Sequence, residues 1–356
     1  MGGELMPARA TQINELLTGG GLTATGDVDP GALKAVLYRE YGLTGQLRRL
    51  ASEKDETSVL TTAEAEFVVK VAPVQETRAV VELQTSAMIL AANTTSLPVP
   101  RVLRTRAGSA ETVLAGDQVV HVMEFLPGTS LAAQDWASWR PQVIGARHGE
   151  LLRGLASFAH PAAHRRLPWD LTHLPVLAGL IDDLPDRPRR NLATAVLKAF
   201  RDTVVPQRPH LRSQVVHGDF SPYNILADPA GTRYVTGIID FGDVHHGPVM
   251  FDVAVAASGL LDHRHPDPWQ YADGHVTGFV TEMPLPGSEI ELVPVAAAAR
   301  TLQRALIAGW RARQVPDRAA YVLDHARHDW ADLEAAFSTV SEAAGRFAAL
   351  AEGNAS

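Results

Sequence analysis

The sequence contains no cysteine among its 356 residues. Disulfides, thiolate zinc sites, iron–sulfur clusters and a cysteine nucleophile are therefore all excluded. Long apolar runs are missing as well, and the longest alanine-rich stretch, Leu292–Ala299, is far shorter than the ~20 residues of a membrane-spanning helix. Residues 1–26 show no basic segment followed by an apolar one, which a secretory signal peptide requires. We therefore expect a cytoplasmic protein.

Positive charge is also scarce. The chain has 32 Lys and Arg residues against 40 Asp and Glu residues, which gives a formal net charge of −8. Duplex DNA and anionic membranes attract basic surfaces, so we expect neither a nucleic acid nor a membrane as the partner. Apolar residues make up 46% and charged residues 20%, the balance of an ordinary globular protein. At ~150 residues per domain, the length suggests two domains.

The hydrophobic pattern changes character near residues 124–128. Upstream, three short apolar runs separated by charged or small residues predict antiparallel strands over residues 46–51, 58–62 and 66–71. Apolar residues at helical spacing predict a helix over residues 77–92. Downstream, most of the pattern is helical, apart from a β-rich segment over residues 215–243. We expect three parts: a flexible leader over residues 1–27, an N-lobe over residues 28–124 and a C-lobe over residues 125–356.

The segment Val215–Ala256 carries the strongest chemical signal. Two apolar runs flank its turn at Asp228–Gly231, which predicts a β-hairpin. Asp219 and Asn224 precede the first strand and Asp240 follows the second, so the hairpin can bring these three side chains to one point. Clustered oxygen donors suit Mg²⁺, and a carboxylate left free of the metal suits a base for an attacking hydroxyl. Each residue alone is typical of turns, but H-G-D-x-x-x-x-N followed by I-D-F-G matches a kinase catalytic loop and metal loop.

Phosphoryl transfer also needs a cation on the phosphates and a helix carboxylate that holds this cation. Lys70 ends the apolar run Phe67–Lys70, and Glu82 follows it on the predicted helix, an order that fits such a pair. Lys54 and Glu76 compete for the two roles. Lys54 lies in a predicted loop, whereas Glu82 lies within the predicted helix, so we favour Lys70 with Glu82.

These motifs resemble the aminoglycoside phosphotransferase-like kinase superfamily, and within it the hydroxylysine kinase branch. The resemblance rests on His217-Gly-Asp219 with Asn224, Ile239-Asp-Phe-Gly-Asp243, Phe251-Asp-Val-Ala254 and Glu82-Leu-Gln-Thr85. It covers residues 28–340. It implies an α+β, bilobal protein-kinase-like fold, with a small antiparallel-sheet N-lobe that carries one helix and a larger, mostly helical C-lobe.

The resemblance implies a kinase that transfers the γ-phosphoryl group of ATP or GTP, with Mg²⁺, to a small-molecule hydroxyl. The acceptor would be a hydroxylated amine or amino acid such as hydroxylysine, or alternatively an aminoglycoside or another amino alcohol. Asp219 would orient the acceptor hydroxyl and accept its proton. Asn224 and Asp240 would hold the metal ions, while Lys70, paired with Glu82, would neutralise the phosphates.

Other residues of the nucleotide site follow from the same resemblance. Ser52, in the turn Ser52–Thr57, would contact the phosphates, although this turn lacks the glycines of protein kinases. Main-chain atoms of Glu124 and Leu126, where a strand passes into the linker, would meet the adenine ring.

Four further residues are expected at or beside the site. His217 would be a structural loop residue. Asp252 would cap the following helix and brace the catalytic loop. Asp243 is a candidate contact for a substrate ammonium or a second metal, with a turn role as the alternative. Arg300 is a candidate contact for a substrate carboxylate, with a buried structural role as the alternative.

Two readings from other classes of protein stay open. A metal-dependent phosphoesterase would use His217, Asp219, Asn224 and Asp240 as ligands and would give Lys70 no role. A catalytically silent nucleotide-binding module is the other, although every key catalytic position is filled here.

Overall fold

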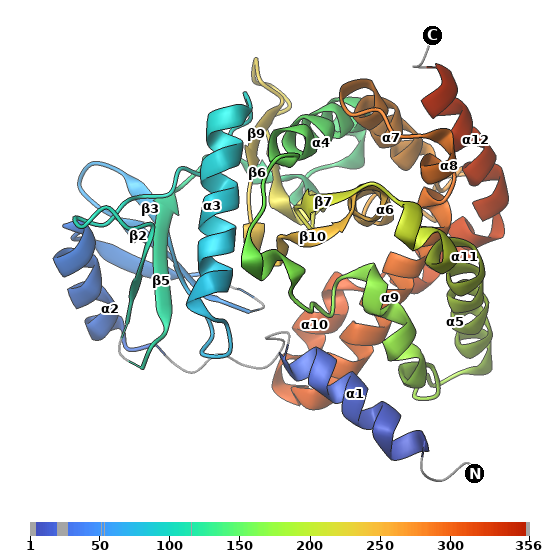
Figure 1. Ribbon diagram of the computed structural model, residues 1–356, viewed down its shortest axis with the longest axis horizontal. Helices are drawn as coiled ribbons and strands as arrows, with labels where there is room; N and C mark the ends of the chain where they lie inside the picture. Colours follow the sequence, from blue (N-terminus) through green and yellow to red (C-terminus); the bar gives the residue numbers. More distant parts are fainter. Residues whose placement is uncertain (1–4, 20–27, 51, 53, 115, 354–356) are drawn as a thin grey trace.

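The computed structural model describes residues 5–19, 28–50, 52, 54–114 and 116–353, and its architecture is α+β (Figure 1). The N-terminal part holds a five-stranded antiparallel sheet with the strand order β1-β2-β3-β5-β4. Its strands are β1 (Gln46–Arg49), β2 (Glu56–Thr61), β3 (Glu66–Val71), β4 (Glu111–Val113) and β5 (Val119–Glu124). With helix α3 (Arg78–Thr94), they confirm the predicted small lobe.

Helices cover the sheet on both faces. The short helix α2 (Pro30–Val36) and its π-helical continuation η1 (Leu37–Tyr41) share one apolar cluster with Val69 and Val71 of β3. Successive residues of a strand point to opposite faces of the sheet. Lys70, between these two valines, therefore points away from α2, toward the side on which α3 stands between the sheet and the helical part (Figure 1).

The C-terminal part is mostly helical. Its α-helices are α4 (Pro141–Leu155), α5 (Arg187–Ala199), α6 (Val249–Ser258), α7 (Gln270–Glu282), α8 (Gly287–Ile290), α9 (Val293–Gln314), α10 (Ala319–His325), α11 (Asp329–Ser338) and α12 (Val340–Gly353). Among the shorter 3-10 segments are η4 (Pro161–His164), η5 (Leu171–Ile181), η8 (Pro222–Asn224) and η9 (Phe241–Asp243). In the described part of the chain, no helix combines the length and the apolarity needed to cross a membrane.

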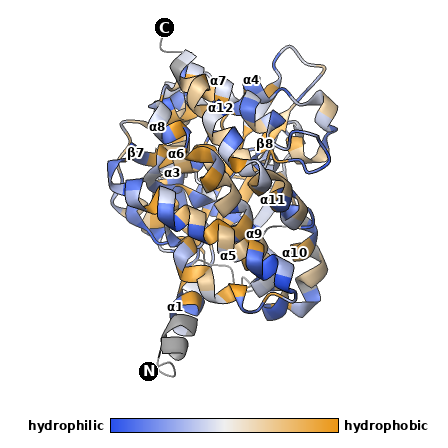
Figure 2. Ribbon diagram, turned by 90° about the vertical axis from the view of Figure 1, so that its right-hand side faces the viewer, coloured by the Kyte–Doolittle hydropathy of each residue, from blue (hydrophilic) through white to orange (hydrophobic). Residues whose placement is uncertain are grey.

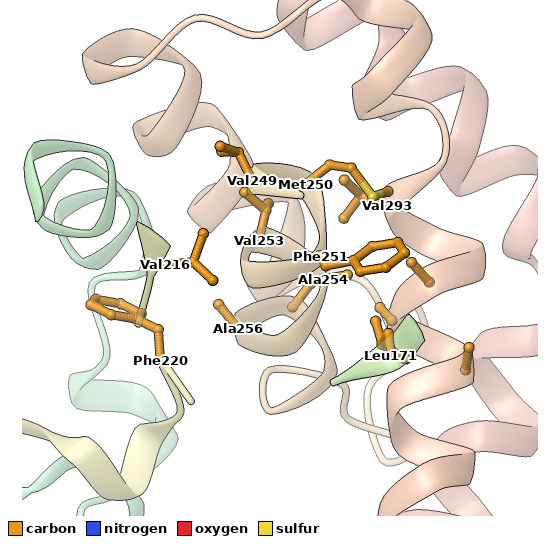
Figure 3. Packing of buried hydrophobic residues seen from close by; sticks show 14 of the residues in the cluster. Leu171, Val216, Phe220, Val249, Met250, Phe251, Val253, Ala254, Ala256 and Val293 are labelled. Carbon is orange, nitrogen blue, oxygen red and sulfur yellow. The ribbon is translucent and has the colours of Figure 1, made fainter. Parts of the chain in front are cut away.

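Helix α6 lies in the core of this part, and its residues are apolar except for Asp252 and Ser258, as suits a fully buried helix. All ten of its residues are buried. Figure 3 shows Val253 facing Val216, while Phe251 points the other way, toward Leu171 and Val293. The helix is thereby fixed between the segment that leads to the catalytic loop and α9.

Two small sheets carry the loops that hold the chemistry. β6 (Thr129–Ser130), β8 (Ile225–Ala227) and β9 (Val235–Ile238) form one, and β7 (Ser213–Val216) pairs antiparallel with β10 (His245–Pro248) in the other. β8 and β9 pair in the register Ile225↔Ile238, which confirms the predicted hairpin.

The expected flexible leader differs in part from the structure. Residues 5–19 form helix α1, and Ile13, Leu16 and Leu17 are buried in the main core. This i, i+3, i+4 stripe gives the helix an apolar face that packs on η5. Hydrophobic and hydrophilic segments alternate along α1 in Figure 2, as they do along α5. Residues 1–4 and 20–27 of the leader lie outside the described residues.

Candidate active site

A cavity of about 750 Å³ lies between the sheet and the helical part, with β3 and β5 on one side and α9 on the other. It is lined by nine of the residues that the sequence singles out, namely Ser52, Lys70, Glu124, Leu126, Asp219, Asn224, Asp240, Asp243 and Arg300. Glu82, His217 and Asp252 are not part of its lining.

The catalytic loop begins where β7 ends. Gly218 adopts φ +83°, and a Cβ at this position would lie 2.2 Å from the main-chain oxygen of Asp243. Only glycine therefore lets this loop approach the segment around Asp240 so closely. Within the loop, Asn224 Nδ2 donates to the Asp219 carboxylate at 2.7 Å and to the Asp219 main-chain oxygen at 3.0 Å. These bonds fix the two side chains relative to each other.

Asp252 braces this loop from inside the core. Its carboxylate is 1% exposed and accepts the main-chain N–H groups of Gly218 at 2.7 Å and His217 at 3.3 Å. Burial alone would raise the pKa of Asp252, but its hydrogen bond with His148 and the hydrogen bond from the Gly218 N–H lower it. The expected N-cap role is wrong, because the helix begins earlier, at Val249, and Asp252 lies inside it.

His217 is occupied within the protein through both ring nitrogens. Nε2 contacts the Ile239 main-chain oxygen at 3.2 Å, and Nδ1 accepts the Asp219 N–H at 3.3 Å. Burial lowers the pKa of His217, which favours the neutral ring. The side chain thus ties the catalytic loop to the end of the hairpin, and neither nitrogen is left for a metal ion.

Asp240 lies in the left-handed region at φ 61°, directly after the hairpin. Its Oδ1 accepts the Gly242 N–H at 3.1 Å and the Lys70 ammonium at 2.8 Å. Burial acts to raise the pKa of Asp240, but Lys70 and the Gly242 amide outweigh it and lower the pKa to about 2. The carboxylate is therefore ionised at neutral pH. The Asp240 side chain lines the cavity and is half-exposed.

Lys70 has different partners from those we expected. It bonds Asp55 at 3.2 Å as well as Asp240, and these two carboxylates raise its pKa despite the opposing effect of burial. The expected pair with Glu82 is wrong: Glu82 is exposed on α3, and no ion pair is found for it within the described residues. The competing residues instead pair with each other, with Lys54 Nζ at 2.7 Å from Glu76 Oε1.

In the strand-to-linker passage, two of the three successive main-chain N–H groups bond to other main-chain oxygens. The N–H groups of Glu124 and Phe125 donate to the main-chain oxygens of Arg101 at 2.9 Å and Glu66 at 3.3 Å. For the Leu126 N–H, the described residues supply no main-chain acceptor. Leu126 therefore offers the donor that a planar base with ring acceptors requires.

Three arginines of α9 line the opposite end of the cavity, namely Arg300, Arg304 and Arg311. Arg300 is 3% exposed, donates to the Trp169 main-chain oxygen at 2.6 Å, and lies 3.8 Å from the Asp219 carboxylate. Its Nε has no hydrogen-bond acceptor among the described residues. Arg300 is thus both anchored in the core and in contact with Asp219. Arg304 pairs with Asp329 at 2.6 Å.

Sequence reasoning missed several lining residues. Asp55 is followed directly by β2, and its carboxylate holds Lys70. Arg304 lies four residues after Arg300, so helical spacing on α9 was the signal that would have found it. Trp169 carries Arg300 over its ring at 4.9 Å, a contact between distant segments that no local pattern announces.

The donor set beside Asp219 fits a hard divalent cation. Asn224 uses its amide nitrogen on Asp219, so its side-chain oxygen is available, and Asp240 presents a half-exposed carboxylate. Oxygen ligands of this kind are those that Mg²⁺ takes together with phosphate oxygens. A bound ion would neutralise charge on transferring phosphates. The Asp219 carboxylate, which Asn224 and Arg300 contact, could orient a hydroxyl and accept its proton.

Comparison with known proteins agrees with this geometry. The model of the APH phosphotransferase enzyme family matches residues 46–287. A hydroxylysine kinase from Danio rerio is 28% identical over 308 residues, which cover 81% of this chain and 85% of the relative.

Two solved structures share the fold. A microcompartment-associated aminopropanol kinase has a TM-score of 0.63 at 17% identity, covering 89% of this chain and 99% of the other. An amicoumacin kinase in complex with AMP-PNP and Ca²⁺ has a TM-score of 0.59 at 13% identity, covering 91% and 96%. The second of these structures thus holds a nucleotide analogue and a metal ion. The chain belongs to the APH phosphotransferase enzyme family and is a small-molecule kinase that transfers phosphate to hydroxyl acceptors.

Proposed function

We propose that this kinase transfers the γ-phosphoryl group of ATP or GTP to the hydroxyl group of a hydroxylated amino acid of the hydroxylysine type. The similarity to a hydroxylysine kinase along most of both chains supports this substrate class. The nucleotide would bind in the cavity between an N-lobe over residues 28–124 and a C-lobe over residues 125–356.

Each residue has a role that follows from its position. Asp219 orients the acceptor hydroxyl and takes its proton as the phosphoryl group moves. Asn224 and Asp240 hold Mg²⁺, while Lys70 and Ser52 contact the phosphates. At the other end of the nucleotide, the main chain of Glu124 and Leu126 meets the base. Because these contacts are made by main-chain atoms, both ATP and GTP fit the proposal.

The observation that carries the acceptor class is the mixture of charges at the α9 end of the cavity. Arg300, Arg304 and Arg311 line it together with acidic residues that include Asp243 and Asp324. A zwitterion suits such a wall, because an arginine can bind its carboxylate in a bidentate fork and an aspartate can bind its ammonium. An aminoglycoside carries several positive charges and no carboxylate, so it offers no anionic group that an arginine of this wall could bind. We therefore place Arg300 at the carboxylate and Asp243 at the ammonium.

The phosphoesterase alternative is disfavoured by His217 and Lys70. His217 has both ring nitrogens engaged within the protein, so it lacks a free ligand atom. Lys70 lies buried in the cavity between two carboxylates, a position without purpose in an enzyme that needs only metal ligands.

A nucleotide-consumption assay tests the proposal. Hydroxylysine, choline, homoserine and an aminoglycoside are each offered with ATP and with GTP, and the Asp219→Asn variant is the blank. We expect hydroxylysine to give the largest kcat/KM, and Asp219→Asn to keep nucleotide binding while its turnover falls about 100-fold or more, because it lacks the base. A larger kcat/KM for the aminoglycoside or for choline would contradict the amino-acid assignment. Full turnover by Asp219→Asn would contradict the role of Asp219.

A further inference from the structure

A buried carboxylate outside the cavity lining connects two sides of the site. Glu76, just before α3, accepts hydrogen bonds from Lys54 at 2.7 Å, Arg165 Nη1 at 3.0 Å and Gln84 Nε2 at 3.3 Å. All three bonds reach its Oε1, while Oε2 is buried without a partner among the described residues. A single carboxylate thus forms ion pairs with two cations that come from different lobes of the chain.

Arg165 uses the rest of its guanidinium on the metal loop, which we define as residues 240–244. Its Nε donates to the Val244 main-chain oxygen at 3.0 Å, and its Nη2 donates to the Gly242 main-chain oxygen. Gln84 of α3 donates to the same Gly242 oxygen at 3.2 Å. The metal loop is therefore held from behind by two side chains, and both of these also bond Glu76.

The metal loop needs such support. Asp240 has φ 61°, a conformation that is costly for a residue with a side chain and persists only where its surroundings hold it. Arg165 and Gln84 donate hydrogen bonds to main-chain oxygens of the loop, so they restrain its backbone directly. Neither they nor Glu76 line the large cavity, so they touch neither nucleotide nor acceptor.

We propose that Arg165 and Glu76 are positioning residues that hold the metal loop so that the Asp240 carboxylate faces the cavity. Glu76 also joins this loop to Lys54, which lines the cavity on the phosphate side. The inference rests on the proposed function in one respect, namely that Asp240 holds the metal ion. It concerns the placement of Asp240 and is independent of which acceptor is phosphorylated.

The first test needs no metal. Hydrogen–deuterium exchange of a peptide that spans the metal loop is compared in the unchanged chain, in Arg165→Met and in Arg165→Lys. We expect exchange in Arg165→Met to be faster by about tenfold, which corresponds to the loss of ~1.4 kcal/mol of local protection. Arg165→Lys keeps the charge near Glu76 but cannot form the same fork of bonds to two carbonyls, so it should exchange at an intermediate rate.

The second test measures the metal site directly. Mn²⁺ binding in the presence of ADP, followed by electron paramagnetic resonance, should weaken about tenfold in Arg165→Met and less in Glu76→Gln, which keeps an acceptor oxygen. ADP affinity without metal should stay unchanged. Arg153→Met is the matched control, because Arg153 also bonds a main-chain oxygen and a carboxylate, both of Glu282, far from the site. It should change neither quantity.

The outcomes separate this inference from the proposed function. Unchanged exchange and unchanged Mn²⁺ affinity in Arg165→Met would overturn it, even if the variant melted earlier. If Arg165→Met does not fold, the same two results in Arg165→Lys and Glu76→Gln decide the matter. Faster exchange with weaker Mn²⁺ binding in a chain that phosphorylates no amino acid would support the inference and reject the proposed acceptor.

Discussion

Replacing Gly218 by alanine probes the closest approach in the site, where the catalytic loop meets the metal loop. Gly218 has φ +83°, and an added Cβ would lie 2.2 Å from the oxygen and 2.9 Å from the carbon of the Asp243 carbonyl group. Gly108 has a similar φ of +86°, but nothing lies within 4 Å of its Cβ position. Gly108→Ala is therefore a matched control with the same backbone change and no collision.

The two variants should differ by the cost of the collision. The left-handed conformation costs an alanine about 1–2 kcal/mol, and both variants bear this cost. At Gly218 the methyl group must also displace a main-chain carbonyl group, and overpacking of this kind adds about 1–3 kcal/mol. We expect the free energy of unfolding to fall by about 2–5 kcal/mol in Gly218→Ala and by about 1–2 kcal/mol in Gly108→Ala.

Turnover should separate the variants more strongly than stability does. Moving the two loops apart by ~1 Å misplaces Asp219 relative to Asp240, and a shift of this size can lower turnover about 100-fold. Urea denaturation measures the stability of each variant, and the nucleotide-consumption assay measures kcat. The reasoning is refuted if both variants lose equal stability and Gly218→Ala retains the turnover of the unchanged chain.

Three further changes test other parts of the site. The pKa of Asp240 is lowered from 3.8 to about 2, so its ion pair contributes fully to stability above pH 3.8 and is lost as the pH falls toward 2. The urea midpoints of the unchanged chain and of Asp240→Asn should therefore converge over that range. A constant difference between the two midpoints would argue against the ion pair. Arg300→Lys should raise the KM for hydroxylysine about tenfold and leave the nucleotide KM unchanged in initial-rate assays, because lysine cannot form the bidentate fork; an unchanged acceptor KM would remove Arg300 from the carboxylate. Glu82→Gln should keep full kcat because Glu82 is exposed, whereas a large loss would restore its expected pairing with Lys70.

The local parts of the site could be predicted from the sequence. Asp219 and Asn224 lie on one short loop, and Asp240 follows the hairpin that this loop begins, so residues close in sequence are joined by one strand pair. Strands β1, β2 and β3 and helix α3 of the small lobe also follow from apolar spacing, whereas the three-residue strand β4 (Glu111–Val113) was not predicted. In each case the structure depends on contacts between residues close in sequence, and the spacing of apolar residues predicts such contacts.

The contacts between distant segments could not be predicted in the same way. Whether Glu82 faces Lys70 depends on the rotation of α3 about its axis. Val81 and Leu83, on either side of Glu82, are buried, while Glu82 is exposed. Arg165 reaches Glu76 across 89 positions, and no spacing rule connects such residues. The helix of the leader could not be predicted for the same reason. Ile13, Leu16 and Leu17 are buried because α1 packs on η5, which is distant in sequence.

The pairing of charges in the cavity explains how a chain of net charge −8 can accommodate an anionic nucleotide. Lys70 is balanced by Asp55 and Asp240, Lys54 by Glu76, and Arg304 by Asp329. Lys70 and Lys54 can thus serve phosphate at their end of the cavity, and none of the three cations is buried without a partner, which would be costly.

The pairing of Lys70 with Asp240 couples the binding of the metal ion to the binding of the nucleotide. If Asp240 turns to a metal ion, Lys70 loses one of its two partners, and a phosphate group can replace that partner. If Lys70 turns to phosphate first, Asp240 is left with a charge that a metal ion can neutralise. Each ligand therefore completes the pairing that the other disturbs, so metal and nucleotide should strengthen each other's binding by the same factor. The ion pair between Lys70 and Asp240 is then the element that makes the two ligands bind together.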